Sequence, residues 1–227
     1  MIIISGCGRS GTSAVARLLY DSGVSVGRDL IPPDEGNAEG YYEERAVVEL
    51  NDEIVQTAGL GAFFATASRE HMLACARPLV ERMRELAAEA TPAWKDPRFC
   101  WTLEAWLDAF DAAPRVVVCL RNPSEVIAST MRYFGMSNDD EGRRAVAHVW
   151  RSENERLLAI IQAHALEATC VEYDDLLADP AAVAARLAAF IGQPLRAAGV
   201  RADLRHHRAA LPDEFANLYA RVRAIGA

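Results

Sequence analysis

The chain has 227 residues, 51% of them hydrophobic, so it can bury a sizeable core, and its length favours a single domain spanning residues 1–227. Its formal net charge of −8 argues against a nucleic-acid-binding protein with a broadly basic surface, so any cationic site must be local. No apolar run approaches the roughly 20 residues of a membrane span, and the first residues lack the charged flank of a signal peptide. We therefore expect a cytoplasmic protein without a membrane span.

Strand and helix patterns alternate along the chain. Residues 1–5 are a short β-branched run that leads through a glycine-rich turn into a helical pattern beginning near residue 14. The segment 28–42, which is rich in proline, glycine and acidic residues, lacks periodicity and is expected to cross one face as a loop. Further strand patterns occupy 93–95, 115–120 and 169–173, and helical patterns occupy 46–58, 72–90, 100–110, 123–131, 143–166 and 180–192. This order predicts an α/β fold of three layers, with a parallel central sheet of about five strands flanked by helices.

The cysteines give no sign of a disulfide framework or a zinc site, because they are odd in number, scattered and without metal-binding spacing. They are Cys7, Cys75, Cys100, Cys119 and Cys170. We therefore expect neither disulfides nor a bound metal.

The glycine-rich turn between the first strand and the first helix predicts an anion site, because unpaired backbone N–H groups and the positive end of the helix dipole meet there. Its candidate binding residues are Gly8, Arg9, Ser10, Gly11, Thr12 and Ser13. The turn follows the Walker A pattern, except that Thr12 replaces the lysine that reaches the outer phosphates of a nucleoside triphosphate. With Arg9 inside the loop, this exchange favours a ligand with a different phosphate chain. A tight turn without a ligand is the alternative.

Two further clusters follow strand patterns, at the sheet edge where α/β proteins bind ligands. Arg121 follows one strand, and Ser129 comes about two helical turns later, so a guanidinium and a hydroxyl can hold a phosphate together. A helix-start ion pair of Arg121 and a packing role for Ser129 are the alternatives. Lys95 and Arg98 end another strand, where two cations in an acidic protein need a carboxylate or an anionic ligand. Surface salt bridges are the alternative interpretation of both cations.

In order and spacing, three of these segments resemble the bacterial branch of the sulfotransferase superfamily that uses 3′-phosphoadenosine 5′-phosphosulfate (PAPS). They are 8–13, 95–98, and 121–123 with Ser129. Segments 36–43 and 51–52 are similar to the acceptor side of that family, and 173–176 with 179–180 to its late strand–helix unit, so the resemblance covers nearly the whole chain.

The resemblance implies a fold like that of P-loop NTPases and a role for each donor-site residue. Arg9 to Ser13 are expected to grip the 5′-phosphosulfate, and Arg121 with Ser129 to bind the 3′-phosphate. Two departures stand out: Arg9 takes the place of a lysine found in many relatives, and an arginine-lysine-glycine loop on the 3′ side is absent. Arg205, with its basic neighbours 206–208, is a candidate substitute, and a solvated charge run is the equal alternative.

Sulfuryl transfer requires an aligned acceptor, cations that spread charge over the sulfuryl oxygens, and a base. Arg9 and Lys95 are the catalytic cations that the chain offers, and no metal is implied. Glu43 is our predicted base, with Glu35 and His71 as alternatives. The acceptor is expected to be a hydroxyl, or an amine, of a small molecule, carbohydrate or lipid.

Two other functions share the same strand, glycine loop and parallel sheet. A P-loop nucleotide-dependent kinase or phosphotransferase is the main alternative, and it calls for a lysine where Thr12 stands. A protein that binds nucleotides without catalysis is the second.

Overall fold

The computed structural model describes residues 1–60, 66–89, 91–137, 139–197, 200 and 209–226. Parallel strands form its central sheet, in the order β2-β1-β3-β4. They are β1 (Ile2–Ser5), β2 (Ala93–Lys95), β3 (Arg115–Leu120) and β4 (Ala168–Glu172). The described part thus has four strands where about five were predicted. Each strand pattern forms one strand, whereas the segment 28–44 makes isolated bridges, between Leu30 and Glu44 and between Asp34 and Asn37.

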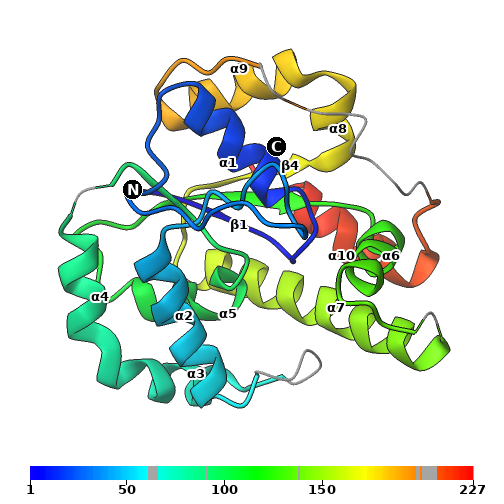
Figure 1. Ribbon diagram of the computed structural model, residues 1–227, viewed down its shortest axis with the longest axis horizontal. Helices are drawn as coiled ribbons and strands as arrows, with labels where there is room; N and C mark the ends of the chain where they lie inside the picture. Colours follow the sequence, from blue (N-terminus) through cyan, green and yellow to red (C-terminus); the bar gives the residue numbers. More distant parts are fainter. Residues whose placement is uncertain (61–65, 90, 138, 198–199, 201–208, 227) are drawn as a thin grey trace.

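Helices cover both faces of the sheet, which confirms the predicted three-layer α/β architecture (Figure 1). One face carries α1 (Thr12–Asp21), α8 (Tyr173–Ala178) and α9 (Pro180–Ile191). The other carries α2 (Arg45–Thr57), α3 (Arg69–Ala76), the 3₁₀ turn η1 (Arg77–Leu79), α4 (Val80–Ala87), α5 (Phe99–Trp106), α7 (Asp140–Ala163) and α10 (Asp213–Arg223). Among the described helices, none combines the length and the apolar character needed to cross a membrane.

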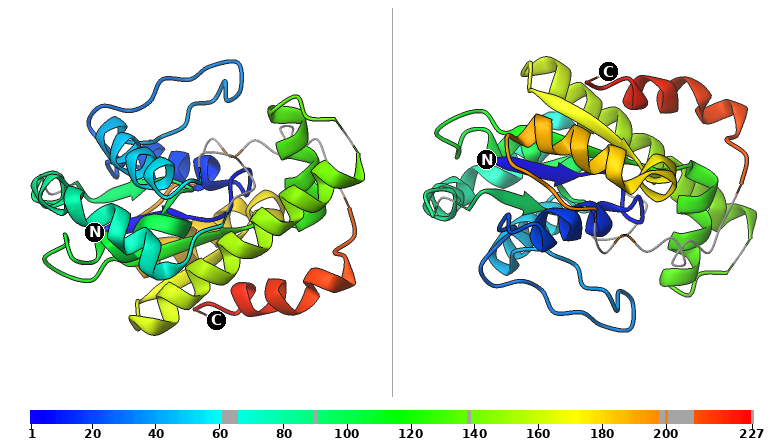
Figure 2. Two further views of the ribbon diagram at one scale, coloured as in Figure 1. Left: turned by 90° about the horizontal axis from the view of Figure 1, so that it is seen from below. Right: turned by 90° about the horizontal axis from the view of Figure 1, so that it is seen from above.

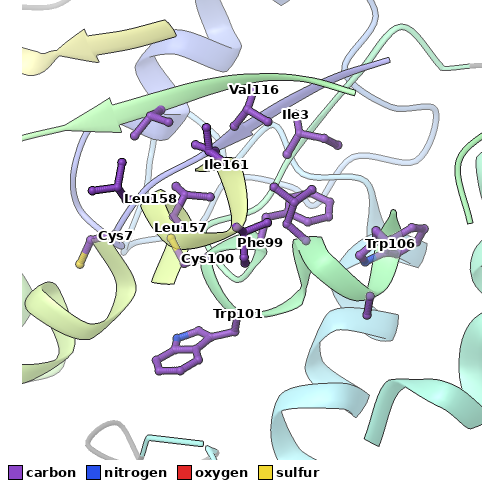
Figure 3. Close-up of a cluster of buried hydrophobic side chains, with 14 of the residues drawn as sticks. Ile3, Cys7, Phe99, Cys100, Trp101, Trp106, Val116, Leu157, Leu158 and Ile161 are labelled. Carbon is purple, nitrogen blue, oxygen red and sulfur yellow. The ribbon is translucent and has the colours of Figure 1, made fainter. Parts of the chain in front are cut away.

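The strands read as continuous apolar runs because both of their faces are buried. Ile2 and Ile4 pack in one core, under α1 and α9, while Ile3 points into the second core, against α5 and α7 (Figure 3). Trp94 and Trp106 meet edge to face in this second core, with ring centroids 5.2 Å apart. Each large side chain buried in this way contributes about 1.5–3 kcal/mol to the stability of the fold.

The carboxyl ends of the strands gather the polar segments at one edge of the sheet. β1 ends at the glycine loop, β2 ends at Lys95, and β3 ends just before Arg121. Gly6 allows this close arrangement, because a Cβ at that position would lie 2.3 Å from the Cys119 carbonyl oxygen. The segment 28–44 projects as a long loop on the side of α1 and α2 (Figure 2). An edge of this kind is where open α/β sheets bind their ligands.

Candidate active site

A cavity of about 620 Å³ opens at this edge of the sheet. Its walls come from the glycine loop, from residues 35–43, from the ends of β2 and β3, from α7, and from α6 (Pro123–Tyr133). The volume lies within the range of about 300–1,000 Å³ that is common for small-molecule sites.

The glycine loop holds a left-handed backbone that presents the first turn of α1 to the cavity. Arg9 has φ 67°, and Gly11, the residue before the helix, has φ 91°. Gly11 packs closely against the ring of Tyr173, which leaves no room for a side chain: an added Cβ would lie 2.5 Å from the ring. The first turn of a helix carries N–H groups without helical partners, and these favour an anion. Ser10 fits such a role less directly: its Oγ is buried and has no hydrogen-bond partner within the described residues.

Arg9, Ser129 and Arg121, which are three of the predicted donor-binding residues, come together at the loop. Arg9 Nε donates a hydrogen bond to Ser129 Oγ at 3.3 Å, and its guanidinium lies 4.6 Å from the ring centre of Tyr133. Arg121 donates to the Arg9 carbonyl oxygen at 3.3 Å and lies over the ring of Tyr173, at 4.5 Å. Burial lowers the pKa of Arg9, and the charge of Arg121 adds to this effect. Two cations so close to each other favour an anionic ligand between them.

The start of α6 fixes the position of this cluster. Asn122 caps the helix by accepting a hydrogen bond from the Ser124 N–H at 3.0 Å, and Pro123 occupies the first helical position, as the sequence indicates. Arg121 Nε also donates to Glu125 Oε2 at 3.0 Å, so the guanidinium is partly engaged by the protein. Ser129 is buried on the same helix and lines the cavity.

Lys95 and Glu43 form a buried ion pair on the opposite side of the cavity. Lys95 Nζ lies 2.5 Å from Glu43 Oε1, and it also donates to Ser13 Oγ at 3.2 Å and to the Tyr41 carbonyl oxygen at 3.1 Å. The lysine thereby joins the first turn of α1 to the segment that carries Glu43. Burial raises the pKa of Glu43, and the charge of Lys95 opposes this shift.

Arg98 is held in salt bridges next to this pair. Its Nε lies 2.6 Å from Asp52 Oδ1, and its NH1 group lies 3.1 Å from Asp96 Oδ1. Asp96 is fully buried, and its other oxygen accepts a hydrogen bond from Asn51 Nδ2 at 2.9 Å. Asn51 is fixed in turn by the Trp106 indole N–H at 2.8 Å. Of the two partners that the sequence left open for these cations, a carboxylate or an anionic ligand, the structure shows carboxylates for both Lys95 and Arg98.

Glu35 and His71 take no part in these contacts. Glu35 lines the cavity but is exposed. His71 belongs to the first turn of α3, where its backbone N–H donates to Ser68 Oγ at 3.2 Å, and it is not among the cavity residues of the described chain. Arg205 lies outside the described residues.

Several cavity residues were not among the predicted site residues, and the contacts of four of them bear on the site. Helical spacing could have predicted Tyr133, because it lies four residues after Ser129 and therefore on the same face of the helix. Its hydroxyl is 2.9 Å from the hydroxyl of Tyr41, which donates to Asp34 Oδ1 at 2.7 Å. Burial raises the pKa of Tyr41 above its usual range. The other two are Tyr173 and Glu153, and no sequence pattern marked Glu153.

No cluster of His, Cys, Asp or Glu suited to a metal ion occurs in the part of the chain that the structure describes. Arginine and lysine side chains line the cavity beside the glycine loop.

Comparison with known proteins agrees with the resemblance seen in the sequence. The model of the sulfotransferase family matches residues 2–197. Among solved structures, a sulfotransferase domain from the curacin biosynthetic pathway aligns with a TM-score of 0.54 and 18% identity, over 97% of this chain and 96% of that one. A sulfotransferase domain from the Synechococcus PCC 7002 olefin synthase aligns with a TM-score of 0.50 and 18% identity, over 100% of this chain and 87% of that one.

No curated protein matched the chain. The two structural likenesses show the fold, and the family match extends over most of the sequence. The chain therefore belongs to the sulfotransferase family.

Proposed function

We propose that the protein transfers a sulfuryl group from PAPS to a hydroxyl, or an amine, of a small-molecule, carbohydrate or lipid acceptor. One observation carries the proposal: the glycine loop, the Arg121–Ser129 cluster and the Lys95–Glu43 pair all border a single cavity. Family membership supports sulfuryl transfer, and the geometry supports an anionic nucleotide as donor.

The donor half of the cavity has the chemistry that PAPS requires. The loop from Gly8 to Ser13 would hold the 5′ anionic group with its N–H groups, and Arg121 and Ser129 would hold the 3′-phosphate. When bound, PAPS supplies an activated sulfuryl group attached to its 5′-phosphate. Thr12 occupies the position of the lysine that a triphosphate needs, so the loop suits the shorter group.

The acceptor half requires a base beside the glycine loop, and Glu43 is the best placed carboxylate. It lies at the end of the segment 35–43 that borders the cavity, and its raised pKa makes it a stronger base than an exposed glutamate. Lys95 lies between Glu43 and Ser13, so its charge would stabilise negative charge that develops on the sulfuryl oxygens. Glu43 would take the proton of the acceptor as the new S–O bond (S–N for an amine) forms. The S–O bond to the 5′-phosphate of the donor would break in the same step, with adenosine 3′,5′-bisphosphate as the leaving group.

We expect adenosine 3′,5′-bisphosphate, the product of the donor, to raise the melting temperature, while ATP with Mg²⁺ has little effect. A ligand at 100 times its dissociation constant adds about 2.7 kcal/mol, and each kcal/mol raises the melting temperature of such a chain by about 2–4 °C. The measurement is a thermal melt with each nucleotide. A larger shift with ATP would instead favour a kinase.

A screen of acceptors with labelled PAPS separates catalysis from nucleotide binding alone. Label should pass to at least one acceptor class among phenols, other alcohols, amines, sugars and lipids. Stabilisation by adenosine 3′,5′-bisphosphate without transfer to any of them would support a binding protein.

Replacing Arg121 by Ala is expected to weaken the binding of adenosine 3′,5′-bisphosphate by about 1.5–3 kcal/mol, as hydrogen bonds to a charged partner are lost. Calorimetry measures the change. Because Arg121 also pairs with Glu125, the double variant Arg121→Ala/Glu125→Gln is the control, as it leaves no charged carboxylate behind. Unchanged affinity in both variants would remove Arg121 from the donor site.

A further inference from the structure

Glu153 is a carboxyl group of the cavity that the proposed reaction does not use. It lies on α7 and lines the same cavity as the glycine loop. Its Oε1 accepts a hydrogen bond from the Trp101 indole N–H at 3.2 Å. Its Oε2 is buried and has no hydrogen-bond partner within the described residues. A carboxylate oxygen in this state costs free energy as long as the group is charged.

The groups around Glu153 compensate its charge poorly. The glycine loop presents the Cys7 thiol and the Gly8 N–H, and α5 presents Trp101 and Cys100. Arg98 is a charged neighbour, but its guanidinium is already paired with two other carboxylates. Burial consequently raises the pKa of Glu153, although the contacts with Cys7, Trp101 and Gly8 oppose the shift. The pKa of the Cys7 thiol is raised as well. Burial is the largest cause, and the charge of Glu153 is the next.

A donor in the glycine loop would bring a second anion close to the Gly8 N–H that already faces Glu153. Two negative charges at one site disfavour each other, and the weaker acid of the two takes up a proton. The 5′-phosphosulfate is a strong acid and keeps its charge, so the proton goes to the glutamate. The proton comes from solvent, and the neutral carboxyl group can still accept the Trp101 N–H through its carbonyl oxygen.

We propose that Glu153 is a positioning residue of the donor site, an inference that rests on the proposed function. In this proposal Glu153 takes up a proton when the anionic group of the donor enters the glycine loop. Donor binding and protonation of Glu153 then favour each other by the same factor. Affinity is greatest at low pH, where Glu153 is already neutral. It falls as pH rises through the pKa of Glu153 in the free protein, by up to about tenfold per pH unit.

The test compares the wild-type protein with Glu153→Gln, which has nearly the same shape but no titrating group. Adenosine 3′,5′-bisphosphate is titrated into each protein by calorimetry from about pH 5 to about pH 9, in two buffers of different ionisation enthalpy. The free ligand titrates alike in both experiments, so the difference between the proteins reports the proton uptake that depends on Glu153. We expect the wild type to take up more protons, by at most one per ligand. Its affinity should fall about tenfold or more relative to Glu153→Gln at the alkaline end.

Equal proton uptake, with parallel affinity curves, would overturn the inference and leave the proposed donor standing. Absence of binding to either folded protein would overturn the proposed donor, and the inference with it.

Should Glu153→Gln fail to fold, Trp101→Phe provides the second test, because it retains the carboxyl group and removes a hydrogen bond to its charged form. The pKa of Glu153 then rises further, so the fall in affinity moves to higher pH. If the affinity of Trp101→Phe fell at the same pH as that of the wild type, the inference would be overturned.

Discussion

Replacing Glu43 by Gln is expected to lower turnover about 10²–10⁴-fold, because the variant retains the size of the side chain and loses the base. The affinity for adenosine 3′,5′-bisphosphate should change little, since the base contacts the acceptor and not the nucleotide. The wild-type rate should also rise with pH through the pKa of Glu43, because only the carboxylate accepts a proton. That pKa is raised by burial, so this limb lies above the range of an exposed glutamate. Steady-state kinetics across pH measures both effects.

Two other variants serve as controls for Glu43. Glu35→Gln alters another carboxylate of the segment 35–43, the exposed Glu35, and His71→Ala alters a residue at the start of α3. Both should retain most of the wild-type turnover. If Glu43→Gln retains more than about a tenth of it, the base is another residue, and the control with the large loss takes its place.

The parts of the fold that local chemistry dictates were predictable from the sequence. The apolar run before Arg121 became β3, and Asn122 with Pro123 began α6 as their capping chemistry requires. The glycine loop was recognisable because a left-handed backbone and a helix start leave a local signature. In each case the residues that decide the structure are neighbours in the chain.

Element boundaries were harder to predict. The helical pattern at 72–90 is divided into α3 and α4 by the 3₁₀ turn Arg77–Leu79, because Pro78 cannot continue a regular helix. Tyr173, which was expected to end a strand, begins α8 instead. The periodicity of apolar residues persists through such breaks and does not mark them.

The candidate site was predictable only in part, because its contacts join segments far apart in the chain. The pairing of Lys95 with Glu43 spans 52 residues, and that of Trp101 with Glu153 also spans 52. Residue type made Lys95 a candidate, but no local pattern indicates which carboxylate it meets. Glu153 resembles any other polar position of a long amphipathic helix until α7 is packed against the glycine loop.

Replacing Lys95 by Met is expected to destabilise the protein by about 3–5 kcal/mol, since it leaves Glu43 buried without its partner. Lys95 is 2% exposed and Glu43 is 7% exposed, so water cannot replace the lost charge. Urea denaturation measures the free energy of unfolding. The double variant Lys95→Met/Glu43→Gln should recover most of the loss, because neither side chain then carries a charge.

The exposed pair of Arg82 and Glu53 provides a matched control for this cycle. Its N–O distance of 2.7 Å is similar, but both side chains are about half exposed, so Arg82→Met should cost at most about 1 kcal/mol. A double variant at Lys95 and Glu43 that is no more stable than Lys95→Met would contradict the expected coupling. Where Lys95→Met remains folded, the pKa of Glu43 should rise further, because the charge that opposed its burial is gone. The part of the pH–rate profile of Lys95→Met that depends on Glu43 should then move to higher pH. This shift would link the stability of the ion pair to the chemistry of the proposed base.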